Sequence, residues 1–127
     1  MEPKDKVIVI TGGGGGIGSS MARAFLREGA KAVVISDLDN ATLEVCADAL
    51  GCDWRVCDVT DEWQVKDLVD YVISEYGRVD VYCSNAGAAG SNSGVLTDAG
   101  NEVWQKQWDL HVMAHVYAAR ALLPSMI

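Results

Sequence analysis

Glycines that follow the first apolar run carry the clearest chemistry in this sequence. Residues 11–18 read TGGGGGIG and lie between a short β-branched run and a stripe of apolar residues at helical spacing. A turn in this place directs the free N–H groups of a helix N-terminus to one point, where hydrogen bonding and the helix dipole favour an anion. Because Gly12, Gly16 and Gly18 lack side chains, a diphosphate can approach the backbone, and the helix and strand can pack closely. The turn therefore predicts a dinucleotide site rather than a flexible loop.

A carboxylate stands where a dinucleotide site needs one. An acidic residue about 20 positions after such a turn, at the end of the second strand, accepts hydrogen bonds from the adenosine ribose and repels a 2′-phosphate. Asp37 follows an apolar run at this distance, and no Arg or Lys lies in the turn or directly after Asp37. We therefore expect NAD, in preference to NADP, as the cofactor. The alternative interpretation of Asp37 is a solvated aspartate in a turn.

The elements that must position these residues alternate between two periodicities along the chain. Short apolar runs predict strands, and stripes at helical spacing predict the helices between them. The strands are expected at Lys6–Ile10, Lys31–Ser36, Trp54–Val59 and Val79–Cys83. The helices are expected at Ile17–Gly29, from a cap at Asn40 to Leu50, from a cap at Thr60 or Asp61 to Gly77, and, after a loop at Asn85–Gly94, at Asn101–Ser125.

These elements predict an α/β fold of the Rossmann type. Strands that are apolar without alternation, each followed by a helix, indicate a parallel sheet that is covered on both faces. Right-handed crossovers order the strands 3-2-1-4, which is the first half of a doubly wound sheet. We expect residues 1–127 to form one dinucleotide-binding domain.

Composition narrows the classes of partner and location. Acidic residues outnumber basic residues by 18 to 10, and this net charge of −8 disfavours nucleic acid or an anionic membrane as a partner. No apolar run approaches the roughly 20 residues that span a bilayer, and the charged start does not resemble a signal peptide. The four cysteines form no Cys-x-x-Cys pair, which favours buried free thiols over disulfides or zinc ligands. A cytoplasmic protein is expected.

The combined segments resemble the short-chain dehydrogenase/reductase family, whose cofactor turn has the form Thr-Gly-x-x-x-Gly-x-Gly. Asp58-Val59 resembles the family's pair that holds the adenine ring, although Asp58 could instead cap the next helix. The stretch at 84–87 reads SNAG and resembles the family's Asn-Asn-Ala-Gly segment, and Trp104 and the stretch at 120–124 resemble its fourth helix. The resemblance assigns to the cofactor Thr11, Gly12, Gly16, Ile17, Gly18, Asp37, Asp58, Val59, Asn85, Ala86 and Gly87.

The resemblance implies an NAD-dependent oxidoreductase that transfers hydride between nicotinamide and a small alcohol or ketone. It also implies a homo-oligomer formed through the fourth and fifth helices. The apolar stretch Val112–Leu123 fits such an interface, and burial of this stretch against the sheet explains it almost as well. The family's fourth helix carries an asparagine of a proton relay seven residues after the tryptophan, and here that position is His111. A relay can survive at His111. His111 and His115 have metal-ligand spacing, but no third ligand is evident, so no metal is expected.

The family's catalytic Ser and Tyr-x-x-x-Lys motif lie on its fifth strand and helix. None of the four tyrosines of this sequence is followed by a lysine four residues later. We therefore expect a domain that is incomplete at its C-terminus and inactive by itself. The alternatives are a non-catalytic NAD-binding sensor or scaffold and an inactive truncated product. A methyltransferase that uses S-adenosylmethionine would share this part of the fold but not the turn, and is disfavoured.

Overall fold

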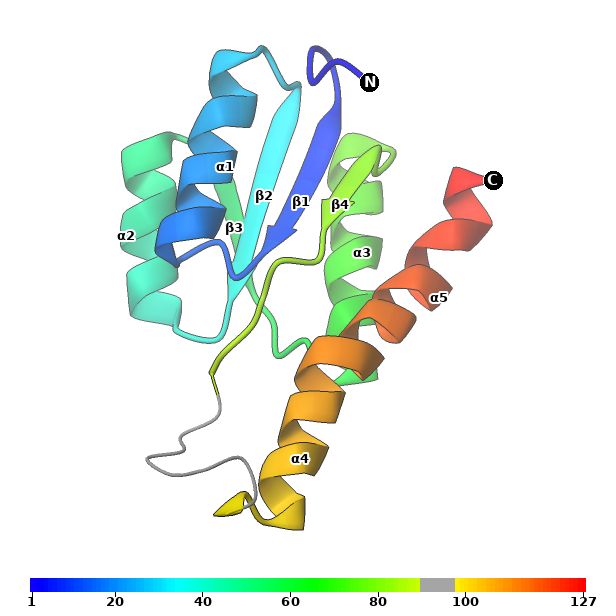
Figure 1. Ribbon diagram of the computed structural model, residues 1–127. Coiled ribbons are helices and arrows are strands. Elements are labelled where there is room, and N and C mark those ends of the chain that lie inside the picture. The colour runs from blue at the N-terminus through cyan, green and yellow to red at the C-terminus, as the bar shows by residue number, and fades with distance from the viewer. Residues whose placement is uncertain (90–97) are drawn as a thin grey trace.

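A twisted sheet of parallel strands forms the centre of the molecule in the computed structural model, which describes residues 1–89 and 98–127 (Figure 1). Within these residues the strand order is β3-β2-β1-β4, as the sequence predicts. Every neighbouring pair is parallel, which places the carboxyl ends of all strands at one edge. The strands are β1 (Val7–Thr11), β2 (Ala32–Asp37), β3 (Asp53–Val56) and β4 (Val81–Cys83).

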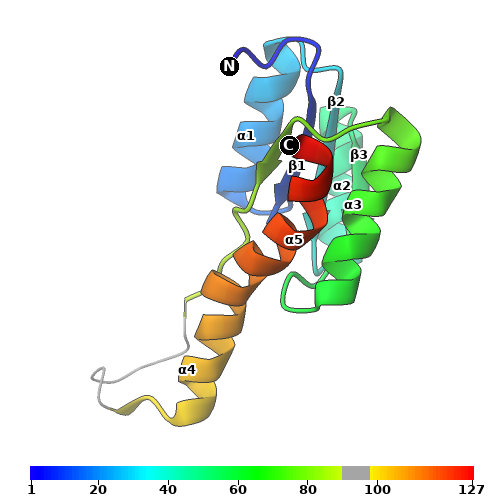
Figure 2. The ribbon, with the colours of Figure 1, turned by 90° about the vertical axis from the view of Figure 1, so that its right-hand side faces the viewer.

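Helices cover both faces of the sheet (Figures 1 and 2). They are α1 (Gly16–Arg27), α2 (Asn40–Leu50), α3 (Glu62–Tyr76), α4 (Asn101–Trp108) and α5 (Ala114–Met126). Ile8 and Ile10 pack on the side of α1 and α2, whereas Val7 and Val9 pack on the side of α3 and α5. These four side chains are fully buried. The run at β1 is apolar without alternation because both of its faces are covered.

The helix ends follow local hydrogen-bond chemistry. Asp61 caps α3 by accepting from the N–H groups of Trp63 and Gln64 at 2.9 and 3.4 Å, which decides between the two predicted caps. The predicted cap at Asn40 was wrong by one residue. Asp39 caps α2 instead and accepts from the N–H of Ala41 at 3.1 Å, because a carboxylate oxygen is an equally good acceptor there.

Other predicted boundaries also move. The third strand ends at Val56 rather than Val59, because its pairing partner β2 ends at Asp37 and the chain then turns. The fourth strand begins at Val81 instead of Val79. The long final helix is α4 and α5 joined by a π-helical turn at Asp109–Met113, which sequence periodicity did not predict. Of the loop expected at 85–94, residues 90–94 lie outside the described part of the chain.

Candidate functional site

The glycine turn joins the end of β1 to the beginning of α1. Gly15 precedes the helix without any side-chain cap, and its carbonyl accepts the N–H of Ser19 at 2.9 Å. Within the described residues, the N–H groups of Gly16, Ile17 and Gly18 have no acceptor. Three unpaired donors at the positive end of a helix dipole form a site for an anion.

Two features of this turn require glycine: close contact with neighbouring atoms, and a positive φ at Gly12. A Cβ at Gly18 would lie 2.2 Å from the carbonyl oxygen of Gly12, and one at Gly13 would lie 2.5 Å from Cβ of Ile35. Gly12 has a φ of +67°, and its Cβ would lie 2.9 Å from Cα of Ala86. These positions are filled by neighbouring atoms of the fold. A Cβ at Gly16, by contrast, meets nothing within 4 Å, so this position is open.

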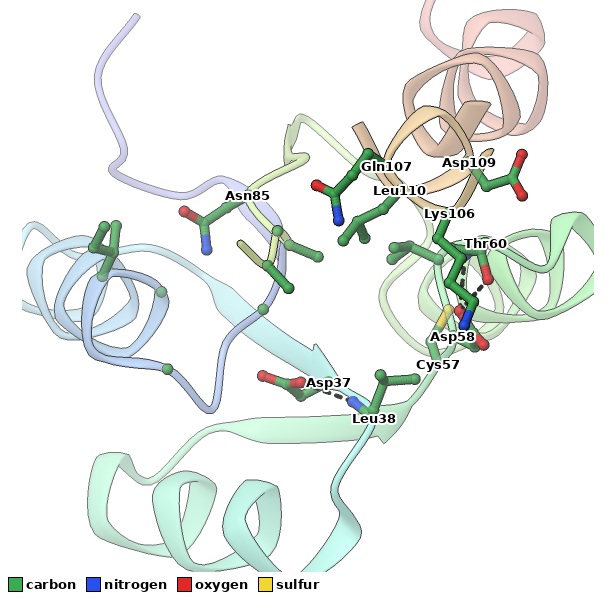
Figure 3. Close-up of a pocket in the computed structure, with 18 of the residues that line it drawn as sticks. Asp37, Leu38, Cys57, Asp58, Thr60, Asn85, Lys106, Gln107, Asp109 and Leu110 are labelled. Carbon is green, nitrogen blue, oxygen red and sulfur yellow. Dashed lines mark hydrogen bonds between the residues drawn. The ribbon is translucent and has the colours of Figure 1, made fainter. Parts of the chain in front are cut away.

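A cavity of about 630 Å³ lies against the turn, at the carboxyl edge of the sheet (Figure 3). It is lined by every residue that the resemblance assigns to the cofactor except Thr11. Ile17 is 73% exposed and lines this cavity, so it is not a core residue. The structure thus brings together segments from β1, β2, β3 and β4 that are far apart in the sequence.

Asp37 lies at the end of β2, directly beside the glycine turn. Its Oδ2 accepts the N–H of Gly14 at 3.1 Å, and its Oδ1 accepts the N–H of Leu38 at 2.8 Å. These bonds fix the carboxylate on the wall of the cavity (Figure 3). Since each carboxylate oxygen has two lone pairs, both oxygens can still accept from a ligand hydroxyl.

Asp58 and Val59 form the cavity wall beyond β3. Asp58 does not cap α3; its Oδ1 accepts from the N–H and the hydroxyl of Thr60 at 2.9 and 2.7 Å. Within the described residues, Oδ2 of Asp58 has no donor and the N–H of Val59 has no acceptor. A free acceptor and a free donor on adjacent residues can recognise a planar group that carries a complementary donor and acceptor.

Thr11 supports the site from behind. Its buried hydroxyl donates to the carbonyl of Cys83 at 3.3 Å and accepts the N–H groups of Asn85 and Ala86, each at 3.1 Å. The Asn85 side chain donates to the carbonyl of Thr11 at 3.0 Å. These bonds hold the segment after β4 against the end of β1, where it closes one side of the cavity.

His111 does not line the cavity but contacts the segment that does. Its Nε2 lies 3.1 Å from the carbonyl oxygen of Ala88, so Nε2 carries the proton and donates. Its Cε1 lies 2.9 Å from the place of a Cβ on Gly87, which leaves no room for a side chain there. The relay role of His111 stays a prediction. No group of three His, Cys, Asp or Glu in the described part of the chain could hold a metal ion.

Several cavity residues were missed by sequence reasoning. One wall comes from α4 and the π-helical turn. The position of these helices depends on tertiary packing, which no local sequence pattern indicates. Leu38 directly follows Asp37, and Cys57 directly precedes Asp58, so adjacency to predicted residues could have found both. Burial raises the pKa of the Cys57 thiol to about 11, which makes it a packing residue with little nucleophilic thiolate. The missed residues are Gly15, Leu38, Cys57, Thr60, Ala88, Lys106, Gln107, Asp109 and Leu110.

Comparison with known proteins places this geometry in a family. Residues 6–127 match the family described as short chain dehydrogenase. The chain belongs to the short-chain dehydrogenase/reductase family. A short chain dehydrogenase from Mycobacterium smegmatis has a similar structure, with a TM-score of 0.87 and 35% identity over 94% of this chain and 52% of that one. The chain therefore has the Rossmann-type fold of this family of oxidoreductases.

Relatives of this chain include plant enzymes and a bacterial reductase. The borneol dehydrogenase, mitochondrial, of Lavandula x intermedia is 35% identical over 94% of this chain and 48% of that protein. The (−)-isopiperitenol/(−)-carveol dehydrogenase, mitochondrial, of Mentha piperita is 42% identical over 73% of this chain and 36% of that protein. The structure of a 3-ketoacyl-(acyl-carrier-protein) reductase from Brucella melitensis, complexed with NADH, gives a TM-score of 0.89 at 32% identity over 96% of this chain and 50% of that one.

The chain spans about half, or less, of the length of these relatives. No helix within residues 1–89 and 98–127 is both long and apolar enough to cross a membrane.

Proposed function

We propose that residues 1–127 form a domain that binds NAD in the cavity beside the glycine turn, and that this domain serves an oxidoreductase acting on a small alcohol or ketone. The single observation that carries the proposal is the convergence of three unpaired N–H groups at α1 with the carboxylate of Asp37 on one cavity. The match to the short-chain dehydrogenase family supports the class of reaction.

The middle of the cavity fits a diphosphate. The N–H groups of Gly16, Ile17 and Gly18 would donate to its oxygens, and the helix dipole of α1 favours its negative charge. The open space at Gly16 would let the phosphate oxygens come close to the backbone. Because all three donors are fixed by the helix, little ordering is needed on binding.

The adenosine end would lie between Asp37 and Asp58. Asp37 would accept from the ribose hydroxyls, and its charge would repel the 2′-phosphate of NADP. The free Oδ2 of Asp58 would accept from the adenine amino group while the free N–H of Val59 donates to a ring nitrogen. Leu38, which is 65% exposed, lines this end and offers an apolar surface to the base.

The nicotinamide end would lie toward Ile17 and the segment after β4. When bound, nicotinamide supplies the hydride acceptor or donor of the reaction. Ala86 and Gly87 line this end of the cavity without bulky side chains, which leaves room for the ring. These 127 residues contain no Tyr-x-x-x-Lys motif, so we expect them to bind the cofactor without catalysing hydride transfer by themselves.

A second candidate is a non-catalytic NAD-binding sensor or scaffold, which would use the same cavity without hydride transfer. The two candidates differ in one measurable way. An oxidoreductase requires the protein, in the form in which it occurs in its cell, to exchange hydride between NAD and an alcohol. NAD binding with no turnover of any alcohol or ketone by that form would favour the sensor.

Isothermal titration with NADH and NADPH tests the cofactor assignment. We expect NADH to bind more tightly, and Asp37→Asn to reduce this preference by roughly tenfold, since it removes one negative charge beside the 2′-phosphate. Asp39→Asn is the matched control, because Asp39 is exposed, does not line the cavity, and asparagine also caps helices. Tighter binding of NADPH than of NADH by the unaltered protein would contradict the assignment.

The expected cytoplasmic location stays a prediction, since the lavender and mint relatives carry a mitochondrial name. Homo-oligomer formation also stays a prediction.

A further inference from the structure

The segment after β4 is held from two opposite sides. On the side of β1, Thr11 binds the N–H groups of Asn85 and Ala86. On the helix side, two histidines from the π-helical turn and the start of α5 reach the same segment. His111 bonds to the carbonyl of Ala88, and Nδ1 of His115 lies 2.6 Å from the hydroxyl oxygen of Ser84. The cavity wall at 85–88 is therefore held near both of its ends.

The contact between His115 and Ser84 is a specific one. A distance of 2.6 Å between Nδ1 and Oγ is that of a well-formed hydrogen bond, and either atom can be the donor. Ser84 is the first residue after β4, and it directly precedes Asn85, whose side chain and N–H are both bound to Thr11. His115 thus holds the point at which the chain leaves the sheet and enters the cavity wall.

We infer that His115 is a positioning residue for the cofactor: through Ser84, which directly precedes the cavity wall at 85–88, it holds that wall in the shape that receives the nicotinamide half. This inference rests on the proposed NAD site. Figure 3 shows Asn85 at one end of the cavity and Asp58 at the other. Since Asp58 and Asp37 would hold adenosine, and α1 the diphosphate, the part of the ligand that reaches 85–88 is nicotinamide riboside.

Such a contact changes the fraction of molecules whose cavity wall is already in its binding shape. His115 and Ser84 touch no ligand in this arrangement, and neither residue lines the cavity. Their bond raises the fraction of molecules in which the wall is already in its binding shape, and the apparent affinity scales with that fraction. Loss of one hydrogen bond of ordinary strength corresponds to roughly a fivefold change in such an equilibrium.

Amide hydrogen exchange tests the contact without any ligand. His115→Ala should speed exchange of the Asn85 and Ala86 amides by about fivefold and leave the amides of β2 unchanged. Ser84→Ala should do the same, and the double variant should be no faster than either single one. Gln105→Ala is the matched control, because it removes an exposed side-chain bond to Asp109 in the same helical segment. Unchanged exchange at Asn85 and Ala86 in His115→Ala would overturn the inference.

Titration with two ligands tests the consequence for binding. ADP carries the adenosine diphosphate part of NAD but no nicotinamide riboside. We expect His115→Ala to weaken NAD binding by roughly fivefold and ADP binding not at all, and His115→Gln to restore NAD binding with an amide. An equal loss for both ligands would mean that His115 acts on the whole fold, which overturns the inference. Failure of the unaltered protein to bind NAD would instead refute the proposed function. The exchange measurement would still test whether the bond between His115 and Ser84 orders the wall, because it needs no ligand.

Discussion

A methyl group added at Gly18 should reduce stability, whereas one added at Gly16 should reduce NAD binding without reducing stability. A Cβ at Gly18 would lie 2.2 Å from the carbonyl oxygen of Gly12 and 2.8 Å from Cα of Gly13, whereas ordinary contacts begin at 3.4 Å. The backbone of the turn or of α1 must therefore move by about 1 Å, and both are packed against the sheet. Overpacking of this severity costs about 3 kcal/mol, so Gly18→Ala should lower the free energy of unfolding by that amount.

Gly16→Ala is the matched control, with the same atoms added two residues away. Its Cβ meets nothing within 4 Å, and Gly16 lines the cavity. Stability should be unchanged or slightly higher, because alanine is the better helix former. Binding should suffer, since the new methyl group would occupy the space that we assign to the diphosphate. We expect at least a roughly tenfold loss of NAD affinity.

Thermal unfolding followed by circular dichroism, together with NAD titration, distinguishes the two outcomes. For a domain of this size, a loss of 3 kcal/mol lowers the midpoint by roughly 10 °C. A Gly18→Ala protein that melts with the unaltered protein would refute the packing argument. A Gly16→Ala protein that binds NAD with undiminished affinity would refute the placement of the diphosphate at the N-terminus of α1.

Three further results are expected. Thr11→Val should cost about 2–3 kcal/mol in chemical unfolding, because it leaves two N–H groups of the segment after β4 without their acceptor, whereas Thr11→Ser should be milder; equal stability of the two variants would contradict this. Bonds from the Arg78 side chain and the Val7 N–H lower the pKa of Asp80 below its ordinary 3.8, so its contribution to stability is present above that value and lost as the pH falls below it. Asp80→Ala should accordingly destabilise more at pH 7 than at about pH 2, and an equal loss at both would count against the pKa shift. Cys57, with a pKa of about 11, should react with iodoacetamide at pH 8 about a hundredfold more slowly than a free cysteine, as peptide mapping would show.

The sequence predicted those parts of the site that depend on short-range patterns. The glycine turn and Asp37 both follow directly from apolar runs, and parallel strands must bring their carboxyl ends to one edge. Even without the structure, therefore, these two segments could be placed side by side. The strand order followed from the same alternation of strands and helices, and the structure confirms it.

Features that depend on distant contacts were not predictable in this way. The need for glycine at position 13 comes from its contact with Ile35, which no local pattern reveals. The wall that carries Lys106 and Leu110 depends on how α4 packs and on the π-helical turn at Asp109–Met113. Strand ends were misplaced because β3 stops where its partner stops, as the pairing of Asp37 with Val56 shows.

The most direct test of the central claim is a titration of the ¹⁵N-labelled 127-residue protein with NAD, followed through its amide resonances. We predict that the amides of Gly16, Ile17 and Gly18 shift first and most, with those of Leu38 and Val59 following at the adenosine end. Resonances around the outer groove of β3 and α3, near Tyr71, should stay in place. Stationary signals from Gly16 to Gly18 at saturating NAD, or shifts confined to the region of Tyr71, would contradict the claim that this cavity is the cofactor site.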